Sequence, residues 1–118
     1  MSVPVINLRI EKGTDFEATF DVFGEDANPV LLNNFTGVAK VRKHPSSPTA
    51  HSFSVSITSS TGEVKIGMGK STTSQLSSGR NYYDVLLTSQ TNNASFKVVE
   101  GTIIVSDSVS LWTPTMLD

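Results

Sequence analysis

The sequence predicts an all-β protein, a single small antiparallel β-sandwich of seven to eight short strands. Apolar and polar residues alternate with a period of two along most of the chain. Turn-forming residues recur at roughly 8–12-residue intervals. The chain also contains 17 Ser and 13 Thr among its 118 residues, and hydroxyl side chains of this kind disfavour helix interiors, while Thr favours strands. This length allows one domain.

The first third of the chain predicts three or four strands. Residues 6–10 and 16–22 each alternate, and a turn at 12–14 separates them. Residues 24–34 combine turn residues with a short apolar run. Alternation then resumes over 38–43. Each alternating segment is typical of a half-buried strand with one face toward a core.

The middle of the chain predicts a β-hairpin. Residues 44–51 contain two prolines, which cannot donate hydrogen bonds to a central ladder, so they form a break between strands. Residues 53–58 and 63–68 then alternate on either side of a turn at 59–62. We expect these two strands to be antiparallel neighbours.

The last strands follow one short helical turn. Residues 71–76 predict a single turn with a hydroxyl cap and with Leu76 directed inward. Alternation then indicates strands over 81–87 and 96–105. The second of these changes phase near Gly101, which indicates a β-bulge at the glycine.

A change of character near the end of the sequence divides the chain into a sandwich at 1–106 and a tail at 107–118. The tail carries the only Trp, and its apolar residues surround a proline. It either folds back over the core, packs as an arm against another subunit, or is disordered. The candidate partner contacts are Leu111, Trp112, Met116 and Leu117 in the tail and Tyr82 in the sandwich.

No arrangement of residues points to catalysis, a cofactor or a metal. The absence of Cys excludes thiolate metal sites and cysteine nucleophiles. Residues 67–72 resemble the end of a phosphate-binding loop, but Val64 stands where that loop requires Gly. His44 and His51 lie in one loop without an acidic residue, and no Gly-x-Ser-x-Gly elbow occurs. We therefore expect a protein that is not an enzyme and has no cofactor.

The charge distribution offers no surface for nucleic acid or a membrane. The net charge is −2, and nine basic residues are scattered along the chain. Lys40, Arg42 and Lys43 form a small basic cluster, which we interpret as a solvated strand face. We interpret Asp84 as a structural carboxylate on a strand. No apolar stretch approaches the roughly 18 residues of a membrane-spanning helix, and the first residues do not resemble a signal peptide.

Three segments together resemble a family of phage proteins. Residues 6–20, an alternating strand followed by Lys-Gly-Thr-Asp-Phe, resemble the opening of the small immunoglobulin-like domain at the N-terminus of tailed-phage baseplate upper proteins and related tail adaptors. Residues 76–85 are similar to that family's leucine, glycine and tyrosine-aspartate step into a penultimate strand. Residues 99–106 are similar to its closing strand. Baseplate upper proteins continue into a helical stalk or receptor-binding region, so we expect a stand-alone subunit here.

The resemblance implies an immunoglobulin-like sandwich in the virion, made in the bacterial host cytoplasm, and no active site. We expect a structural or assembly protein of the tail, baseplate, neck or capsid surface, whose partners are other virion proteins, with self-association left open. The alternative is a carbohydrate-binding module for host-surface recognition. In that case Trp112 and Tyr82, with Phe35 or Phe23, would stack on the sugar.

Overall fold

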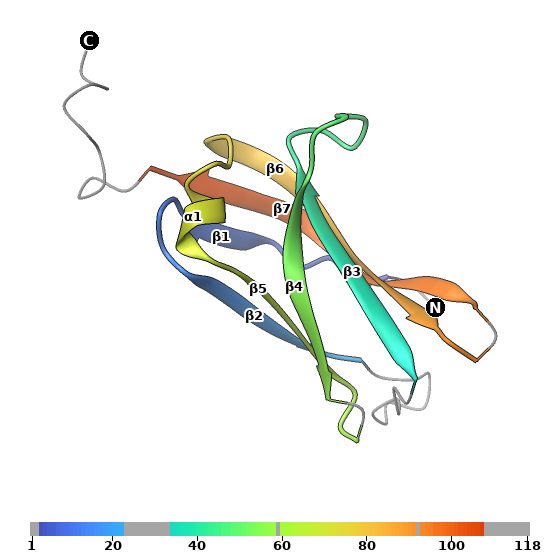
Figure 1. Ribbon diagram of the computed structural model, residues 1–118. Coiled ribbons are helices and arrows are strands. Elements are labelled where there is room, and N and C mark those ends of the chain that lie inside the picture. The colour runs from blue at the N-terminus through green and yellow to red at the C-terminus, as the bar shows by residue number, and fades with distance from the viewer. Residues whose placement is uncertain (1–2, 23–33, 59, 92, 108–118) are drawn as a thin grey trace, which may run out of the picture.

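The computed structural model, which describes residues 3–22, 34–58, 60–91 and 93–107, confirms the all-β prediction (Figure 1). A single four-residue helix accompanies seven strands in this part of the chain. The apolar run near residue 31 lies outside the described residues. The elements are β1 (Leu8–Glu11), β2 (Phe16–Asp21), β3 (Phe35–Arg42), β4 (His51–Thr58), β5 (Glu63–Met68), α1 (Lys70–Thr73), β6 (Gly79–Ser89) and β7 (Ser95–Ser106).

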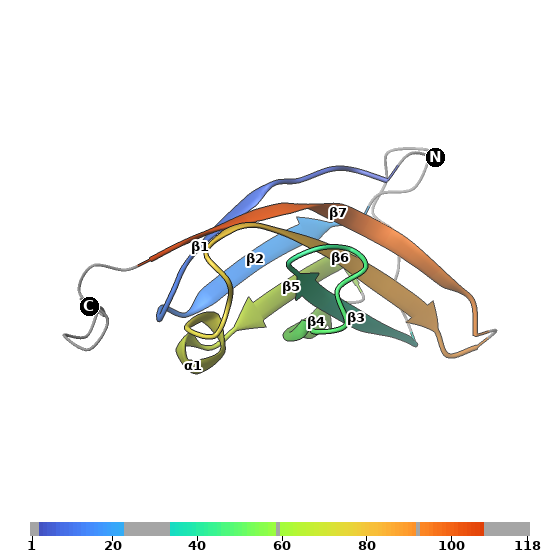
Figure 2. The same ribbon diagram turned by 90° about the horizontal axis from the view of Figure 1, so that it is seen from above.

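The seven strands form one strongly curled sheet in the order β1-β7-β6-β3-β4-β5-β2 (Figure 2). The curl arises at β4, because His51–Phe53 pairs with β3 whereas Ser54–Thr58 pairs with β5. One strand therefore belongs to both layers, and the two halves of the sheet face each other as a nearly closed sandwich. The predicted hairpin between β4 and β5 is confirmed, with Val55 opposite Ile66.

The core lies between these two halves and takes side chains from every strand. Alternate positions on each strand point inward, as the period of two predicts. The buried apolar side chains are Ile10, Phe20, Ala39, Val41, Phe53, Val64, Ile66, Met68, Leu76, Tyr83, Val85, Leu87, Val99, Ile103 and Val105.

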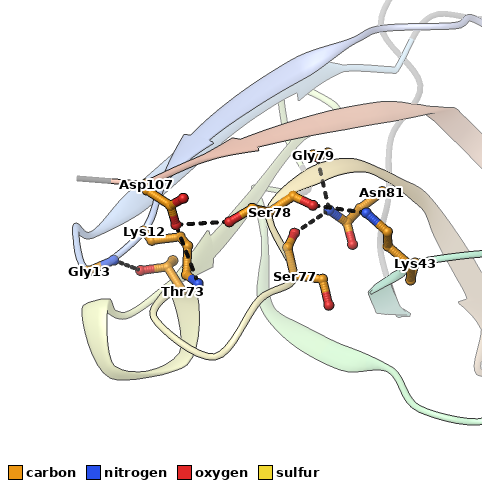
Figure 3. A network of polar contacts seen from close by, with 9 residues as sticks. All are labelled: Lys12, Gly13, Lys43, Thr73, Ser77, Ser78, Gly79, Asn81 and Asp107. Atoms are coloured by element: carbon orange, nitrogen blue, oxygen red, sulfur yellow. Dashed lines mark hydrogen bonds and ion pairs between the residues drawn. The ribbon is translucent and has the colours of Figure 1, made fainter. Parts of the chain in front are cut away.

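The short helix α1 is fixed by contacts with the β1–β2 turn. It begins after Gly69, which makes no side-chain cap, so the predicted hydroxyl cap is wrong. The Lys70 amide instead donates to Asp15 Oδ1 at 2.9 Å. The buried Thr73 hydroxyl accepts from the Gly13 amide at 3.0 Å (Figure 3) and donates to the Thr14 carbonyl at 2.8 Å. The hydroxyl thus joins two distant segments, while Leu76 is buried as predicted.

The pairing of β1 with β7 is parallel, whereas every other strand pair that the structure describes is antiparallel. In this respect the structure differs from a purely antiparallel sandwich. The first strand runs beside the last one in the same direction, with Leu8 opposite Ile103. β1 lies in the layer that contains β7, and the chain then crosses to β2 at the far end of the sheet order.

The N-terminal segment meets β7 through an irregular ladder. The Ile6 amide donates to the Glu100 carbonyl at 2.9 Å. At the next step the Thr102 amide donates to the Asn7 side-chain oxygen, at 3.1 Å, instead of to backbone. The Ile6 carbonyl accepts the Tyr83 hydroxyl at 2.7 Å. Side chains therefore satisfy the two backbone groups that a regular parallel ladder would pair with each other.

The irregularity in β7 lies at a different residue from the one predicted. The register between β6 and β7 shifts where Val85 faces Val99 and Leu86 faces Lys97, so the extra residue is Val98. Gly101 has another role. A Cβ at this position would collide with the carbonyl group of Ile6. The glycine therefore allows the N-terminal segment to cross β7 closely.

We predict that Gly101→Ala lowers the free energy of unfolding by about 1–3 kcal/mol, because the added methyl displaces the N-terminal segment. Gly69→Ala is the matched control: no atom lies within 4 Å of its Cβ position, and its φ of −74° suits any residue. We expect a change of less than about 0.5 kcal/mol there. Urea unfolding followed by circular dichroism measures both, and equal effects would refute this role for Gly101.

We predict that Tyr83→Phe destabilises the fold by about 1–2 kcal/mol near neutral pH, because the Ile6 carbonyl loses its partner. Burial raises the pKa of Tyr83 to about 12, above the value of about 10 expected in the unfolded chain. The unfolded state therefore loses this proton first, and the stability that Tyr83 contributes below pH 10 is lost as the pH rises toward 12.

The measurement is the free energy of unfolding of both proteins between pH 7 and pH 12. The difference between wild type and Tyr83→Phe should narrow above about pH 10. Tyr82→Phe is the control, since it removes a hydroxyl that makes no hydrogen bond within the described residues. A gap for Tyr83→Phe that stays constant over this pH range would contradict the burial effect.

Candidate functional site

The outer face of β3, β6 and β7 is hollowed. The depression has a volume of about 600 Å³ and is open to solvent along one side of the curled sheet. The N-terminal segment forms one wall through Val5 and Asn7, and Pro45 of the loop after β3 forms another part of the rim. Pockets of this size hold small ligands or protruding side chains of a partner.

The cross-strand register determines which side chains share this face. Inward residues such as Ala39 and Val85 are buried, so their neighbours along each strand point outward. Three rows run across β3, β6 and β7 as a result. The rows are Val38, Leu86 and Lys97; Lys40, Asp84 and Glu100; and Arg42, Tyr82 and Thr102.

An ion cluster occupies the middle of the face. Lys97 Nζ lies 3.1 Å from Glu100 Oε1 and 3.5 Å from Asp84 Oδ2. The hydrogen bond with Glu100 raises the pKa of Lys97, and the charges of both carboxylates act in the same direction. The structure thus pairs Asp84 with Lys97, consistent with a structural carboxylate. All three side chains are partly exposed, so their pairing adds little to stability.

Exposed apolar side chains lie around this cluster. Val5 is 65% exposed, Val38 51% and Leu86 36%, and all three line the hollow. Val38 and Leu86 face each other directly across β3 and β6. Neighbouring exposed apolar residues in a concavity mark a contact surface more often than isolated ones do.

The basic residues of the face differ in how they are held. Arg42 Nη1 donates to the Ser47 carbonyl at 2.6 Å and thereby ties the loop after β3 to the sheet. Lys40 is exposed and has no ion pair or hydrogen bond within the described residues. Its ammonium is therefore available to a carboxylate of a partner.

The histidines of the described residues lie apart from the ion cluster of this face. No group of three His, Cys, Asp or Glu side chains in the described part of the chain comes together as a metal site. His44 is exposed in its loop, while His51 begins β4 and lines a separate small depression of about 150 Å³. Among the same residues, no helix has the length and apolar character to cross a membrane.

The structure places one of the predicted contact residues in the hollow. Tyr82 is half-buried in the row with Arg42 and lines the depression. The other predicted contacts, Leu111, Trp112, Met116 and Leu117, lie outside the described residues, and so does the tail from residue 108 onward.

The apolar part of the face is not among the predicted contact residues. Val38 and Leu86 are apolar residues at outward positions of alternating strands, and this violation of the pattern is a signal that the sequence carries. No such break in the alternation marks Val5. This residue reaches the hollow because the N-terminal segment crosses β7 at Gly101, and a local sequence pattern does not show this crossing.

A network of polar contacts fixes the point where the chain leaves β7 (Figure 3). Asp107 Oδ1 accepts from the Ser78 hydroxyl at 2.8 Å and lies 3.6 Å from Lys12 Nζ. Lys43 Nζ donates to the Ser78 carbonyl at 2.9 Å, and Asn81 Nδ2 donates to the Ser77 carbonyl at 2.8 Å. The start of the tail is thereby anchored to the turns at one end of the sandwich.

Comparison with known proteins identifies similarity in fold and none in sequence. No protein-family model matches the chain. No curated protein matches it either. Part of a family 123 glycoside hydrolase from Clostridium perfringens aligns at 13% identity and a TM-score of 0.42 over 92% of this chain and 24% of that chain, a similarity too weak to show a shared fold. The N-terminal domain of phage TP901-1 ORF48 aligns with 90% of each chain covered, at 12% identity and a TM-score of 0.56. This chain is therefore similar in fold, over nearly its whole length, to the N-terminal domain of a phage protein.

Proposed function

We propose that this protein is a non-enzymatic structural or assembly component of a tailed-phage particle that acts through contacts with other virion proteins. The observation that carries the proposal is the fold shared with the N-terminal domain of phage TP901-1 ORF48, which covers 90% of both chains. The tail, baseplate, neck and capsid surface are the candidate locations. The protein would be made in the host cytoplasm and assembled into the virion there.

An immunoglobulin-like topology is part of the same proposal. In such a sandwich the third, sixth and seventh strands form one layer, and the second, fifth and fourth form the other. The observed order contains both sets, as β7-β6-β3 and as β4-β5-β2. β1 differs by joining β7 instead of β2.

The hollowed face supports a role in binding proteins. It combines exposed apolar side chains, an aromatic ring and charges that are already paired, as the centres of protein interfaces often do. A specific contact needs roughly 1,000 Å² or more of buried area, counting both partners. The hollow and its rim supply one side of such a contact. The outermost strands β1 and β2 offer a second way to bind a protein, in which a strand of the partner pairs with the edge of the sheet.

The alternative, a carbohydrate-binding module, has weaker support. Tyr82 is the one partly exposed ring that lines the hollow among the described residues. Phe35 is half-buried and packs edge-on against Phe96, with ring centroids 5.7 Å apart. Phe23 and Trp112 lie outside the described residues. Sugar sites stack on free aromatic faces, so we favour a protein partner.

We predict that purified particles of the phage that encodes this chain contain it at a fixed copy number, measurable by quantitative mass spectrometry. Particles grown with the Val38→Glu variant should carry at least roughly tenfold fewer copies, because the new charge would be buried under the partner. The matched control is Ser56→Glu, which places the same charge on an exposed position of β4.

The two variants are first compared for thermal stability, so that a folding defect is recognised. Absence of the protein from particles would contradict the virion proposal. Normal incorporation of the Val38→Glu variant would support the virion location but would show that the contact with other virion proteins lies on another face. A glycan array probed with wild type and Tyr82→Ala tests the alternative, and specific binding that requires Tyr82 would support that alternative over the present proposal.

A further inference from the structure

We propose that the hollow on β3, β6 and β7 is the acceptor for residues 108–118 of a second copy of this chain, with Trp112 seated against Val38 and Leu86. The inference rests on the proposed function, since it names one partner for the contact surface. It extends that function by making the protein able to associate with itself, independently of other virion proteins.

The shape of the surface determines what kind of object fits it. The face is concave, so it cannot pack against the same face of another copy without leaving the centre empty. A protruding segment with a large side chain fills such a depression. The tail carries the only Trp of the chain and three further large apolar residues within 111–117, and a buried indole removes about 150–250 Å² from water.

The length of the tail favours a second copy over the same chain. Asp107 is anchored at the end of the sandwich by Ser78 and Lys12 (Figure 3). Trp112 is five residues further on, which is at most about 17 Å of extended chain. The Val38–Leu86 pair lies level with Lys97, roughly 30 Å back along β7 at the rise of a strand. A chain's own Trp112 therefore falls short of this pair, whereas this limit does not apply to the Trp112 of a second copy.

The charges of the two surfaces are complementary. Residues 107–118 contain two Asp and neither Lys nor Arg. On the acceptor face Lys97, Asp84 and Glu100 together carry a charge of −1, and Lys40 and Arg42 bring the net charge of the face to +1. Lys40 makes no ion pair or hydrogen bond within the described residues. Asp118 at the far end of the tail is the carboxylate that reaches Lys40 when Trp112 fills the apolar part of the hollow.

An arm that fits the face of the next copy makes a head-to-tail contact. Such contacts generate a ring when the rotation between copies closes, and an open chain when it does not. Association should therefore increase with the protein concentration, and the number of copies at which it stops depends on the rotation between them.

Trp112 is the only Trp, so its fluorescence reports directly on the proposed contact. We predict that the emission of the full chain shifts to shorter wavelength as the concentration increases, in parallel with the mass measured by light scattering. Val38→Glu should weaken this association at least roughly tenfold, because it puts an unpaired charge under the indole. Ser56→Glu, on the opposite layer, should leave it unchanged.

A charge exchange provides a test that does not depend on the apolar pocket. Lys40→Glu should weaken association by about three- to tenfold, and Asp118→Lys in the same protein should restore it. Circular dichroism of each variant at low concentration shows that it is folded. Restoration by the second substitution cannot result from a folding defect of the first.

Three results would overturn the inference. Emission at short wavelength that does not depend on concentration would place the arm on its own chain. Association that Val38→Glu does not weaken would place the arm on another face. A monomer at all concentrations, with the protein still present in purified particles, would reject self-association and leave the virion proposal standing.

Discussion

The attachment of the N-terminal segment to β7 is the contact on which both the fold and the hollow depend. The Ile6 carbonyl lies over Gly101 and accepts the Tyr83 hydroxyl, while the Asn7 side chain takes the Thr102 amide. These bonds hold the first strand against the last one and cover part of the sheet edge. They also position Val5 and Asn7, which form the N-terminal wall of the hollow. Gly101 leaves room for this crossing, and the Tyr83 hydroxyl stabilises it.

Local patterns predicted the strands well, because burial of one face leaves a period of two in the sequence. The pairing of β1 with β7 left no such trace, since Asn7 and Thr102 are 95 positions apart and no local rule joins them. For the same reason the sequence predicts the bulge at Gly101, whereas the structure has it at Val98. A glycine in a strand indicates either a bulge or a close backbone crossing, and the sequence does not distinguish the two.

The candidate site was predictable only in part. Tyr82 was identified from its residue type, and the structure places it in the hollow. Val38 and Leu86 break the alternation at outward positions, but nothing local shows that they meet across β3 and β6. Their meeting follows from register, and the concavity follows from the way β4 joins the two layers. The residue types were therefore visible in the sequence, whereas the surface they form required the tertiary structure.

The distribution of charge over the hollow limits which partner can cover it. Burial of a charge without a partner is costly, whereas burial of a pair that is already neutral costs much less. Lys97 with Asp84 and Glu100 carries a net charge of −1, while Lys40 and Arg42 bring the net charge of the face to +1, and Arg42 already donates to the loop. Lys40 lies opposite Asp84 in the register but makes no ion pair or hydrogen bond within the described residues, so its ammonium group can pair with a partner's carboxylate. A partner that covers the hollow must therefore bring an acidic group to Lys40 together with apolar side chains for Val38 and Leu86. A basic partner does not supply the acidic group, and an uncharged sugar supplies neither the acidic group nor the apolar side chains.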